Sequence, residues 1–316
     1  MLPTMCIRAE RICRVIVVWI AFLACGCPGI ASSEPSPSST RRDELDHWVP
    51  AIGLYSGLVM SDTSATAASD PLVGSNPLEL LRPSAEGALY LMNPFIGVAL
   101  ELSSPAFRTD FGRPRAFVHA DVISHFGFRQ DIAREGAPDA MEAPGTAFFP
   151  ERAIPGQGST TSAQLNTPVV AVGAGVAFRF HWIGRVWRLK PSIEFIRERY
   201  DIEGVVNRAV RLTVGSNGPP PEPSTFRFIE VRGSVAENFY SLGPGIELEV
   251  DVARRGPVLL SLGLGGRFYR TLGNRQLSFS GSYTDELGSE TASFTFEKDP
   301  WTMQVGVGLR FRWAPE

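Results

Sequence analysis

Residues 302–313 read TMQVGVGLRFRW, an unbroken alternation of polar and apolar positions. Side chains of a β-strand point to opposite faces in turn, so the segment predicts a strand with one apolar face and one polar face. The apolar face ends on aromatic residues, and the polar face holds two arginines and two glycines. A soluble antiparallel sheet also alternates, so the rest of the chain must show which environment each face meets.

Seven earlier segments alternate in the same way, which predicts eight strands. The alternation of the sixth slips near residues 238–240, which predicts a β-bulge there. Long connections follow the first, third, fifth and seventh strands, with irregular loops at about 129–162 and 205–224, and short turns follow the others. This asymmetry is typical of an up-and-down outer-membrane barrel. The seven segments lie at about residues 48–60, 89–103, 116–123, 163–180, 187–195, 225–253 and 258–267.

The chain is therefore predicted to be all-β, an eight-stranded antiparallel up-and-down transmembrane β-barrel. The alternative is a ten-stranded barrel, in which residues 277–296 form a membrane hairpin of their own. Several predicted strands exceed the ~9–11 residues that cross a bilayer. We expect the excess to project as a ridge of sheet above the outer surface.

The charged residues indicate which face of the strands lies in the lumen. A Lys or Arg side chain that faced lipid would destabilise the barrel by roughly 2–4 kcal/mol at the bilayer midplane. The charged faces of the strands are therefore expected to point into the lumen. Inside a narrow lumen the six acids can pair with the six Lys and Arg residues, and glycines suit an interior that side chains must fill. The lumen charge network is predicted to contain Glu101, His119, Asp121, Arg179, Arg188, Lys190, Glu194, Glu247, Glu249, Asp251, Arg267, Arg310 and Arg312.

Tryptophans mark the predicted strand ends. Trp48, Trp182, Trp187 and Trp313 fall at periplasmic ends, and Trp301 falls at an outer end. Tryptophan prefers the headgroup zone, so these residues predict an aromatic girdle. The alternative is a soluble β-sandwich with scattered edge tryptophans, but that fold would have to bury one face of each sheet and would not repeat charges so regularly.

The first 31 residues resemble a secretory leader. Arg8, Arg11 and Arg14 precede an apolar run over residues 15–25, and residues 29–31 (GIA) offer small residues for cleavage. The predicted organisation is a signal peptide over 1–31, a disordered periplasmic lead-in over 32–46, the barrel over 47–313 and a tail over 314–316. A second interpretation makes residues 22–25 (FLAC) a poor lipoprotein box with Cys25 lipidated.

Composition narrows the possible chemistry. The net charge of −3 gives no basic surface for nucleic acid. All four cysteines (Cys6, Cys13, Cys25 and Cys27) lie in the predicted leader, which leaves the mature chain without a thiol nucleophile or a thiolate metal ligand. The four histidines show no metal-binding spacing. We expect no cofactor and no metal.

The end of the chain resembles the insertion signal of outer-membrane barrels, through Gly308, Phe311 and Trp313, although Ala314-Pro315-Glu316 follows the usual last aromatic residue. This resemblance implies recognition by the barrel-assembly machinery. Residues 48–313 are similar in architecture to small OmpA-type or OmpW-type barrels. The resemblance implies contact with outer-membrane lipid and a location in the outer membrane of a Gram-negative-type cell.

Three functions fit such a barrel. The first is a non-catalytic structural or surface-anchor protein whose long outer loops contact the environment or a partner, with an unknown extracellular ligand. The second is a narrow channel for small solutes. The third is a lipid-modifying barrel enzyme that uses His119, Asp121, Ser124 and His125. Because residues two apart on a strand are about 7 Å apart and Ser124 faces away from His119, the sequence predicts no enzyme.

Overall fold

The computed structural model describes residues 47–69, 84–107, 113–126, 129–136, 158–211, 226–285 and 288–313. The predicted signal peptide, the lead-in and the tail lie outside the described residues, as does Cys25. Among the described residues no helix is long and apolar enough to cross a membrane. The strands are β1 Val49–Ser69, β2 Ser84–Ser103, β3 Arg115–His125, β4 Gln130–Gly136, β5 Gly158–Trp182, β6 Arg185–Arg211, β7 Phe226–Arg255, β8 Val258–Leu272, β9 Gln276–Asp285 and β10 Gly288–Trp313.

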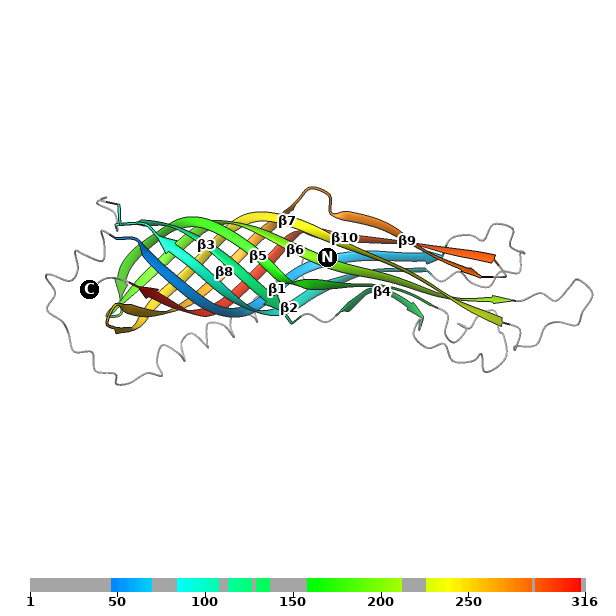
Figure 1. The fold of residues 1–316 in the computed structure, drawn as a ribbon, viewed down its shortest axis with the longest axis horizontal. Helices are drawn as coiled ribbons and strands as arrows, with labels where there is room; N and C mark the ends of the chain where they lie inside the picture. Colours follow the sequence, from blue (N-terminus) through cyan, green and yellow to red (C-terminus); the bar gives the residue numbers. More distant parts are fainter. Residues whose placement is uncertain are drawn as a thin grey trace, which may run out of the picture. The chain divides into compact units, whose positions relative to one another are not determined.

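Eight of these strands close into an antiparallel ring. The order is β1-β2-β3-β5-β6-β7-β8-β10, and the pairing of β1 with β10 closes it (Figure 1). The two short strands prolong members of the ring. β4 takes up pairing with β5 after β3 has ended, and β9 takes up pairing with β10 after β8 has ended. The segment 277–296 is thus a hairpin that lengthens the sheet, and the barrel has eight strands.

Two tight turns define one end of the barrel, here named the turn end. Ile183 and Gly184 connect β5 to β6 with φ angles of 50° and 66°, and a positive φ at both central residues is typical of the hairpin turn whose twist matches the strands. Gly256, with φ of 55°, helps connect β7 to β8. The opposite end, where β6 and β7 run furthest, is named the extended end.

The outward face of β6 changes from apolar to polar along the strand. From Trp187 to Phe195, nine residues, the outward positions are apolar, and beyond them Arg197 and Arg199 are exposed. Nine residues match the ~9–11 that a tilted strand needs to cross a bilayer. The band is formed on this strand by Trp187, Leu189, Pro191, Ile193 and Phe195, and we name the corresponding part of the ring the membrane-level band.

The inward face of β6 makes the opposite change at the same height. Its inward residues are polar or charged up to Glu194, whereas Ile196, Tyr200 and Ile202 are apolar or aromatic and at most 2 % exposed. Outside a bilayer, water is the outer solvent and the interior must be apolar, as in a soluble protein. The strands therefore carry a charged interior at membrane level and a mainly apolar interior beyond it, apart from buried residues such as Glu198.

The same inversion explains the irregularity at residues 238–240, where the prediction of a bulge was wrong. β7 pairs with β6 residue by residue, without a shift, through Asn238, Phe239 and Tyr240. Phe239 faces inward and Tyr240 faces outward, which continues the regular alternation of the whole strand. The apparent slip is a change in which face is apolar. The register shift of β7 against β8 lies between Asp251 and Ala253.

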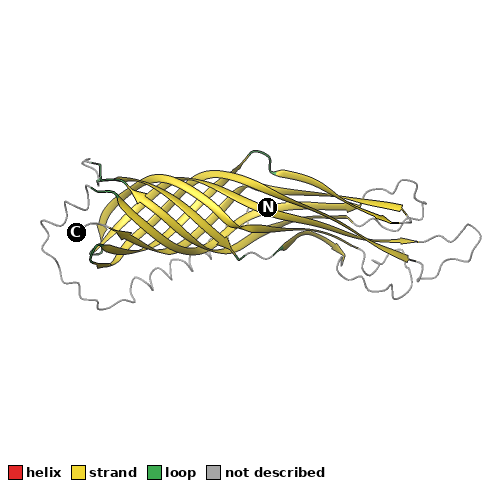
Figure 2. Ribbon diagram, viewed as in Figure 1, coloured by secondary structure: helices red, strands yellow, loops and turns green. Residues whose placement is uncertain are grey.

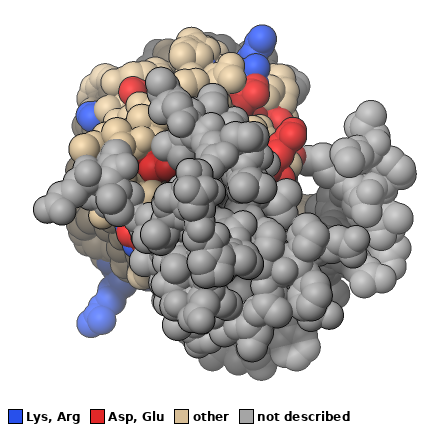
Figure 3. All heavy atoms as spheres, turned by 90° about the vertical axis from the view of Figure 1, so that its right-hand side faces the viewer, with Lys and Arg blue, Asp and Glu red and all other residues tan. Residues whose placement is uncertain are grey.

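The strands are also longer than the sequence indicated. β4 and the start of β5 occupy both ends of the predicted loop 129–162, and β6 continues to Arg211 within the predicted loop 205–224 (Figure 2). The rest of both predicted loops lies outside the described residues. Viewed onto the extended end, both acidic and basic side chains are visible on the described surface (Figure 3). Polar outward faces suit a sheet that continues into water.

Candidate functional site

The membrane-level lumen holds two groups of ionised side chains. The first, the turn-end cluster, lies nearer the two tight turns and is centred on Lys190 of β6. Its ammonium lies 2.5 Å from a carboxylate oxygen of Glu101 and 3.0 Å from one of Glu249, and all three side chains are at most 2 % exposed. Charge-assisted hydrogen bonds of this kind are the strong ones. The turn-end cluster comprises Glu101, Arg188, Lys190, Glu247, Glu249, Asp251, Arg310 and Arg312.

Three arginines complete the turn-end cluster. Arg310 of β10 lies 2.7 Å from Glu101 and 3.1 Å from Glu247, and it also contacts Glu249. Arg312 contacts Glu249 and donates to the Ser261 hydroxyl at 3.0 Å. Arg188 of β6 forms a bidentate ion pair with Asp251 of β7. Since β2, β6, β7 and β10 all contribute, the cluster ties the four strands together across the lumen.

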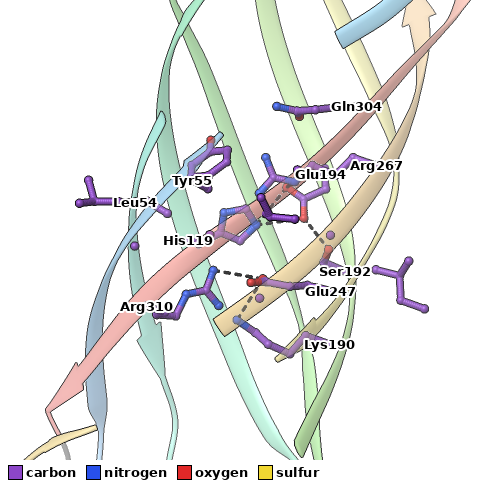
Figure 4. Close-up of a pocket in the computed structure, with 18 of the residues that line it drawn as sticks. Leu54, Tyr55, His119, Lys190, Ser192, Glu194, Glu247, Arg267, Gln304 and Arg310 are labelled. Carbon is purple, nitrogen blue, oxygen red and sulfur yellow. Dashed lines mark hydrogen bonds and ion pairs between the residues drawn. The ribbon is translucent and has the colours of Figure 1, made fainter. Parts of the chain in front are cut away.

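The second group, the histidine cluster, lies next to the first and is shown in Figure 4. His119 is clamped between two carboxylates: its Nδ1 is 3.0 Å from Asp121 and its Nε2 is 3.0 Å from Glu194. Arg267 of β8 lies 2.5 Å from Asp121, and the Ser192 hydroxyl donates to Glu194. The expectation that His119 and Asp121 are too far apart was wrong, because their side chains lean together across the two-residue repeat.

The turn-end cluster is neutral as a whole. Its four carboxylates are matched by one lysine and three arginines, 4 − 4 = 0. Burying charges is expensive, and their mutual attraction offsets that cost only when the geometry satisfies every partner. Removing one member of a buried pair costs about 3–5 kcal/mol, because it leaves an uncompensated charge. The turn-end cluster is therefore expensive to disrupt, although its presence is weak evidence of added net stability.

A cavity remains between the two groups. Its volume is ≈ 60 Å³, and Tyr55, His119, Lys190, Glu194 and Arg267 are among its lining residues. In Figure 4 Leu54 points away from these polar side chains, as expected for the alternate face of β1. A water molecule needs roughly 10–15 Å³ of such space, so the cavity has room for a few waters.

Aromatic side chains fill the lumen beyond the membrane-level band. Tyr200, Phe239 and Phe296 come from three strands, and their ring centroids are 5.6, 5.9 and 6.2 Å apart. All three are at most 2 % exposed, and we name them the aromatic layer. Burial, together with the nearby Glu198 carboxylate, raises the pKa of the Tyr200 phenol well above its ordinary value. This shift favours the neutral phenol, which suits a packed interior.

A second apolar cluster lies further along the strands. Phe294 packs there against Phe279, with ring centroids 5.2 Å apart, and against Val206 and Ile229. Gly204 and Gly233 make room for the Phe294 ring, since a Cβ at Gly204 would clash with it. Side chains thus fill the lumen at several levels: ionised side chains near the turn end, and hydrophobic side chains beyond them.

The structure brings most of the predicted lumen residues into contact. Twelve of the thirteen form the ion pairs described above, and Arg179 lies at the rim, beside Arg188. The predicted charge network did not include Tyr55, Tyr269 and Gln304, which share the charged part of the lumen, nor the aromatic layer. These residues could have been found from the sequence, because the alternate positions that face inward continue along each strand beyond its last charged residue.

The predicted girdle residues lie on the outside of the ring. Trp48, Trp182, Trp301 and Trp313 are 43–58 % exposed, and Trp187 packs against Trp182 in a tilted arrangement with ring centroids 5.1 Å apart. Gly308, Phe311 and Trp313 form the last turn-end stretch of β10. Ser124 faces outward, away from His119, and His125 packs against Phe95 inside. The described residues hold no group of three or more His, Cys, Asp or Glu side chains placed to bind a metal ion.

Comparisons with known proteins return barrels of the outer membrane. No family model and no curated protein sequence matches the chain. Similar solved structures include a major outer membrane protein from Thermus thermophilus (9% identity, 80% of this chain and 99% of that chain, TM-score 0.27). The outer membrane protease OmpT from Escherichia coli is another (9% identity, 84% and 97%, TM-score 0.30). The outer membrane protein OprG from Pseudomonas aeruginosa is a third (9% identity, 82% and 95%, TM-score 0.21).

One of these comparisons corrects the prediction that the chain is not an enzyme. Because a protease is among the similar structures, a barrel architecture does not exclude catalysis, and that prediction is withdrawn. A likeness at 9% identity and a TM-score of 0.30 assigns no protease activity to this chain either. The chain is an all-β, eight-stranded transmembrane barrel, and the solved structures it is similar to are outer-membrane barrels.

Proposed function

We propose that this protein is a surface anchor of the outer membrane: a closed barrel that carries a stiff extension of its own sheet out of the membrane. The membrane-level band supplies the anchor, since its outward residues are apolar and its charges point inward. The extension is a continuation of the same strands with a packed apolar interior. The loops at its tip would contact the environment or a partner.

The filled lumen is the observation that carries this proposal. A conducting pore needs a continuous wet path, yet the turn-end cluster, the histidine cluster and the aromatic layer lie one after another along the interior. Eight strands leave an interior just wide enough for side chains to fill. Since Tyr200, Phe239 and Phe296 are at most 2 % exposed, they would have to move before a solute could pass.

The proposed orientation puts the turn end in the periplasm. Short turns on the periplasmic side and long outer connections are the rule for such barrels. The first strand of the ring starts at the turn end, where Val49 pairs with Ser103, and the last strand finishes there, where Trp313 pairs with Val258. This arrangement fits export behind a leader and insertion from the periplasm by the barrel-assembly machinery.

Electrical recording in planar bilayers tests the closed lumen. The wild-type barrel should give no unitary currents. Arg310→Ala combined with Phe239→Ala and Phe296→Ala should conduct, because it loosens the turn-end cluster and the aromatic layer together. Stable unitary currents from the wild-type protein would instead favour the second candidate, a narrow channel for small solutes.

Gel migration of the outer-membrane fraction tests location and fold together. A folded barrel in that fraction should run at a different apparent mass before and after boiling. Recovery of the protein folded and monodisperse in buffer without detergent would contradict a lipid-facing band.

A further inference from the structure

Two stacked pairs of aromatic rings lie on the outer face of the ring, where the membrane-level band ends. Phe195 of β6 stacks on Tyr240 of β7 with ring centroids 6.0 Å apart, and Phe268 of β8 stacks on Trp301 of β10 at 4.7 Å. All four side chains are 37–44 % exposed. Exposed aromatic rings at this level are typical of the zone between the acyl chains and the headgroups of a bilayer.

An exposed arginine accompanies each stacked pair. Arg197 lies two residues beyond the first pair on β6, and its Nε and one Nη donate to the side-chain oxygen of Asn238 at 3.2 and 3.1 Å. Arg270 lies two residues beyond the second pair on β8, with its guanidinium 5.8 Å from the centroid of the Trp301 ring. Both arginines thus have neutral partners, and no described carboxylate forms an ion pair with either of them.

The acids on the outer face at this level do not lie between the two arginines. Asp201 of β6 lies further towards the extended end, 3.8 Å from Arg199. Asp299 of β10 accepts a hydrogen bond from the Trp301 amide at 2.9 Å, and Asp62 lies on the next strand, β1. The described outward residues that separate the two arginines on β7 and β8 are uncharged, so this sector of the boundary is cationic.

Strand register gives the spacing of the two arginines. Arg197 is directly opposite Tyr240, and Arg270 is directly opposite Leu242, so the arginines are two strands and two residues apart. With strands about 4.8 Å apart and residues about 3.4 Å apart along each strand, their Cα atoms are about 12 Å apart. Two long side chains at that spacing can reach one large headgroup from both sides.

We propose that the two stacked pairs together with Arg197 and Arg270, here named the aromatic–arginine patch, bind the phosphorylated headgroup of an outer-leaflet lipid. Guanidinium groups bind phosphate through pairs of parallel N–H bonds. The apolar outward residues of the membrane-level band continue directly from the patch and would contact the acyl chains of the same lipid. A lipid satisfies both surfaces at once, which a soluble anion cannot do. The assignment to the outer leaflet rests on the orientation proposed above.

Calorimetric titration in uncharged detergent tests the patch. The purified barrel would be titrated with mixed micelles that contain lipid A, a glycolipid with two phosphates, and then with the same lipid after its phosphates have been removed. Lipid A should bind saturably, and the dephosphorylated lipid should bind at least tenfold more weakly. Equal binding of the two lipids would overturn the proposal, as would binding of lipid A that inorganic phosphate abolishes at constant ionic strength.

Variants assign the binding to this patch. Arg197→Gln together with Arg270→Gln should weaken the binding of lipid A at least tenfold and leave the binding of the dephosphorylated lipid unchanged. The matched control is Arg134→Gln, an exposed arginine of β4 that pairs with Asp131 at 3.5 Å, and it should bind as tightly as wild type. Wild-type affinity in the double variant would overturn the proposal.

The fold and the orientation are checked separately from the binding. Because both arginines are exposed, the double variant should keep the wild-type gel migration before and after boiling, which shows that a loss of binding is not a loss of fold. Micelles present lipid to both ends of the barrel, so the titration does not depend on orientation. Loss of binding would overturn the site, whereas a reversed orientation in cells would overturn its assignment to the outer leaflet.

Discussion

The ammonium of Lys298 on β10 lies 2.6 Å from the carboxylate of Glu198 on β6, inside the sheet beyond the membrane-level band. Both side chains are at most 1 % exposed, and Lys298 also donates to Thr271 at 3.2 Å. The Tyr200 and Phe239 rings lie 5.8 Å from the ammonium. This buried ion pair therefore lies beside the aromatic layer and joins β6 to β10 across the interior.

The pair should be costly to break and easy to replace. Lys298→Met alone should destabilise the barrel by about 3–5 kcal/mol, since it leaves a buried carboxylate without its cation. The double variant Lys298→Met, Glu198→Leu should recover most of that loss, because well-packed apolar residues often equal a buried pair. Urea unfolding in lipid vesicles measures both free energies. A double variant as unstable as the single one would show that the pair itself stabilises the extension.

The faces of the strands could be predicted from sequence, because alternation with a period of two is local. Each strand of the ring has its expected inward residues, from Glu101 on β2 to Arg312 on β10. The point along β6 where its outward face passes from lipid to water could also have been predicted, since the outward Phe195 is followed two residues later by the outward Arg197. Expecting one face of each strand to stay apolar along its whole length hid that change and produced the false bulge at residues 238–240.

The partners within the lumen could not be predicted in this way. Lys190 is directly opposite Glu247 in the register, yet its shortest contact, 2.5 Å, is to Glu101 on another strand. Arg188 is opposite Glu249 but pairs with Asp251. Such diagonal and cross-lumen contacts depend on strand tilt and twist, which are properties of the closed ring. The alternation of residues along one strand therefore cannot predict these contacts.

The position of the lipid boundary on β10 can be tested with one charge moved along its outer face. Leu309→Arg, within the membrane-level band, should cost roughly 2–4 kcal/mol, the penalty for arginine near the bilayer midplane. Thr291→Arg, also outward but in the extension, should change stability by less than about 0.5 kcal/mol, as surface substitutions do. Urea unfolding in vesicles compares them. Equal costs would place lipid against the whole length of β10.

The Phe294 ring should make Gly204 intolerant of any side chain. A Cβ at Gly204 would overlap the ring, so Gly204→Ala should destabilise by about 1–3 kcal/mol through overpacking. Gly266→Ala is the matched control, because a Cβ there meets nothing nearer than a backbone oxygen at 4.0 Å. Combining Gly204→Ala with Phe294→Leu should relieve part of the strain. Strictly additive losses in the double variant would mean that the two residues do not touch.

Membrane orientation can be read from single cysteines, because every native cysteine lies at or before residue 27. Ser289→Cys places an exposed thiol at the extended end, and Ile183→Cys places one, at a position 74% exposed, in a turn at the opposite end. A maleimide that cannot cross membranes should label Ser289→Cys in intact cells. It should label Ile183→Cys only after the outer membrane has been permeabilised.

Wild-type protein is the control for that experiment. If the leader is removed, the mature chain should stay unlabelled under both conditions, because no thiol remains. Labelling of Ile183→Cys but not Ser289→Cys in intact cells would reverse the orientation.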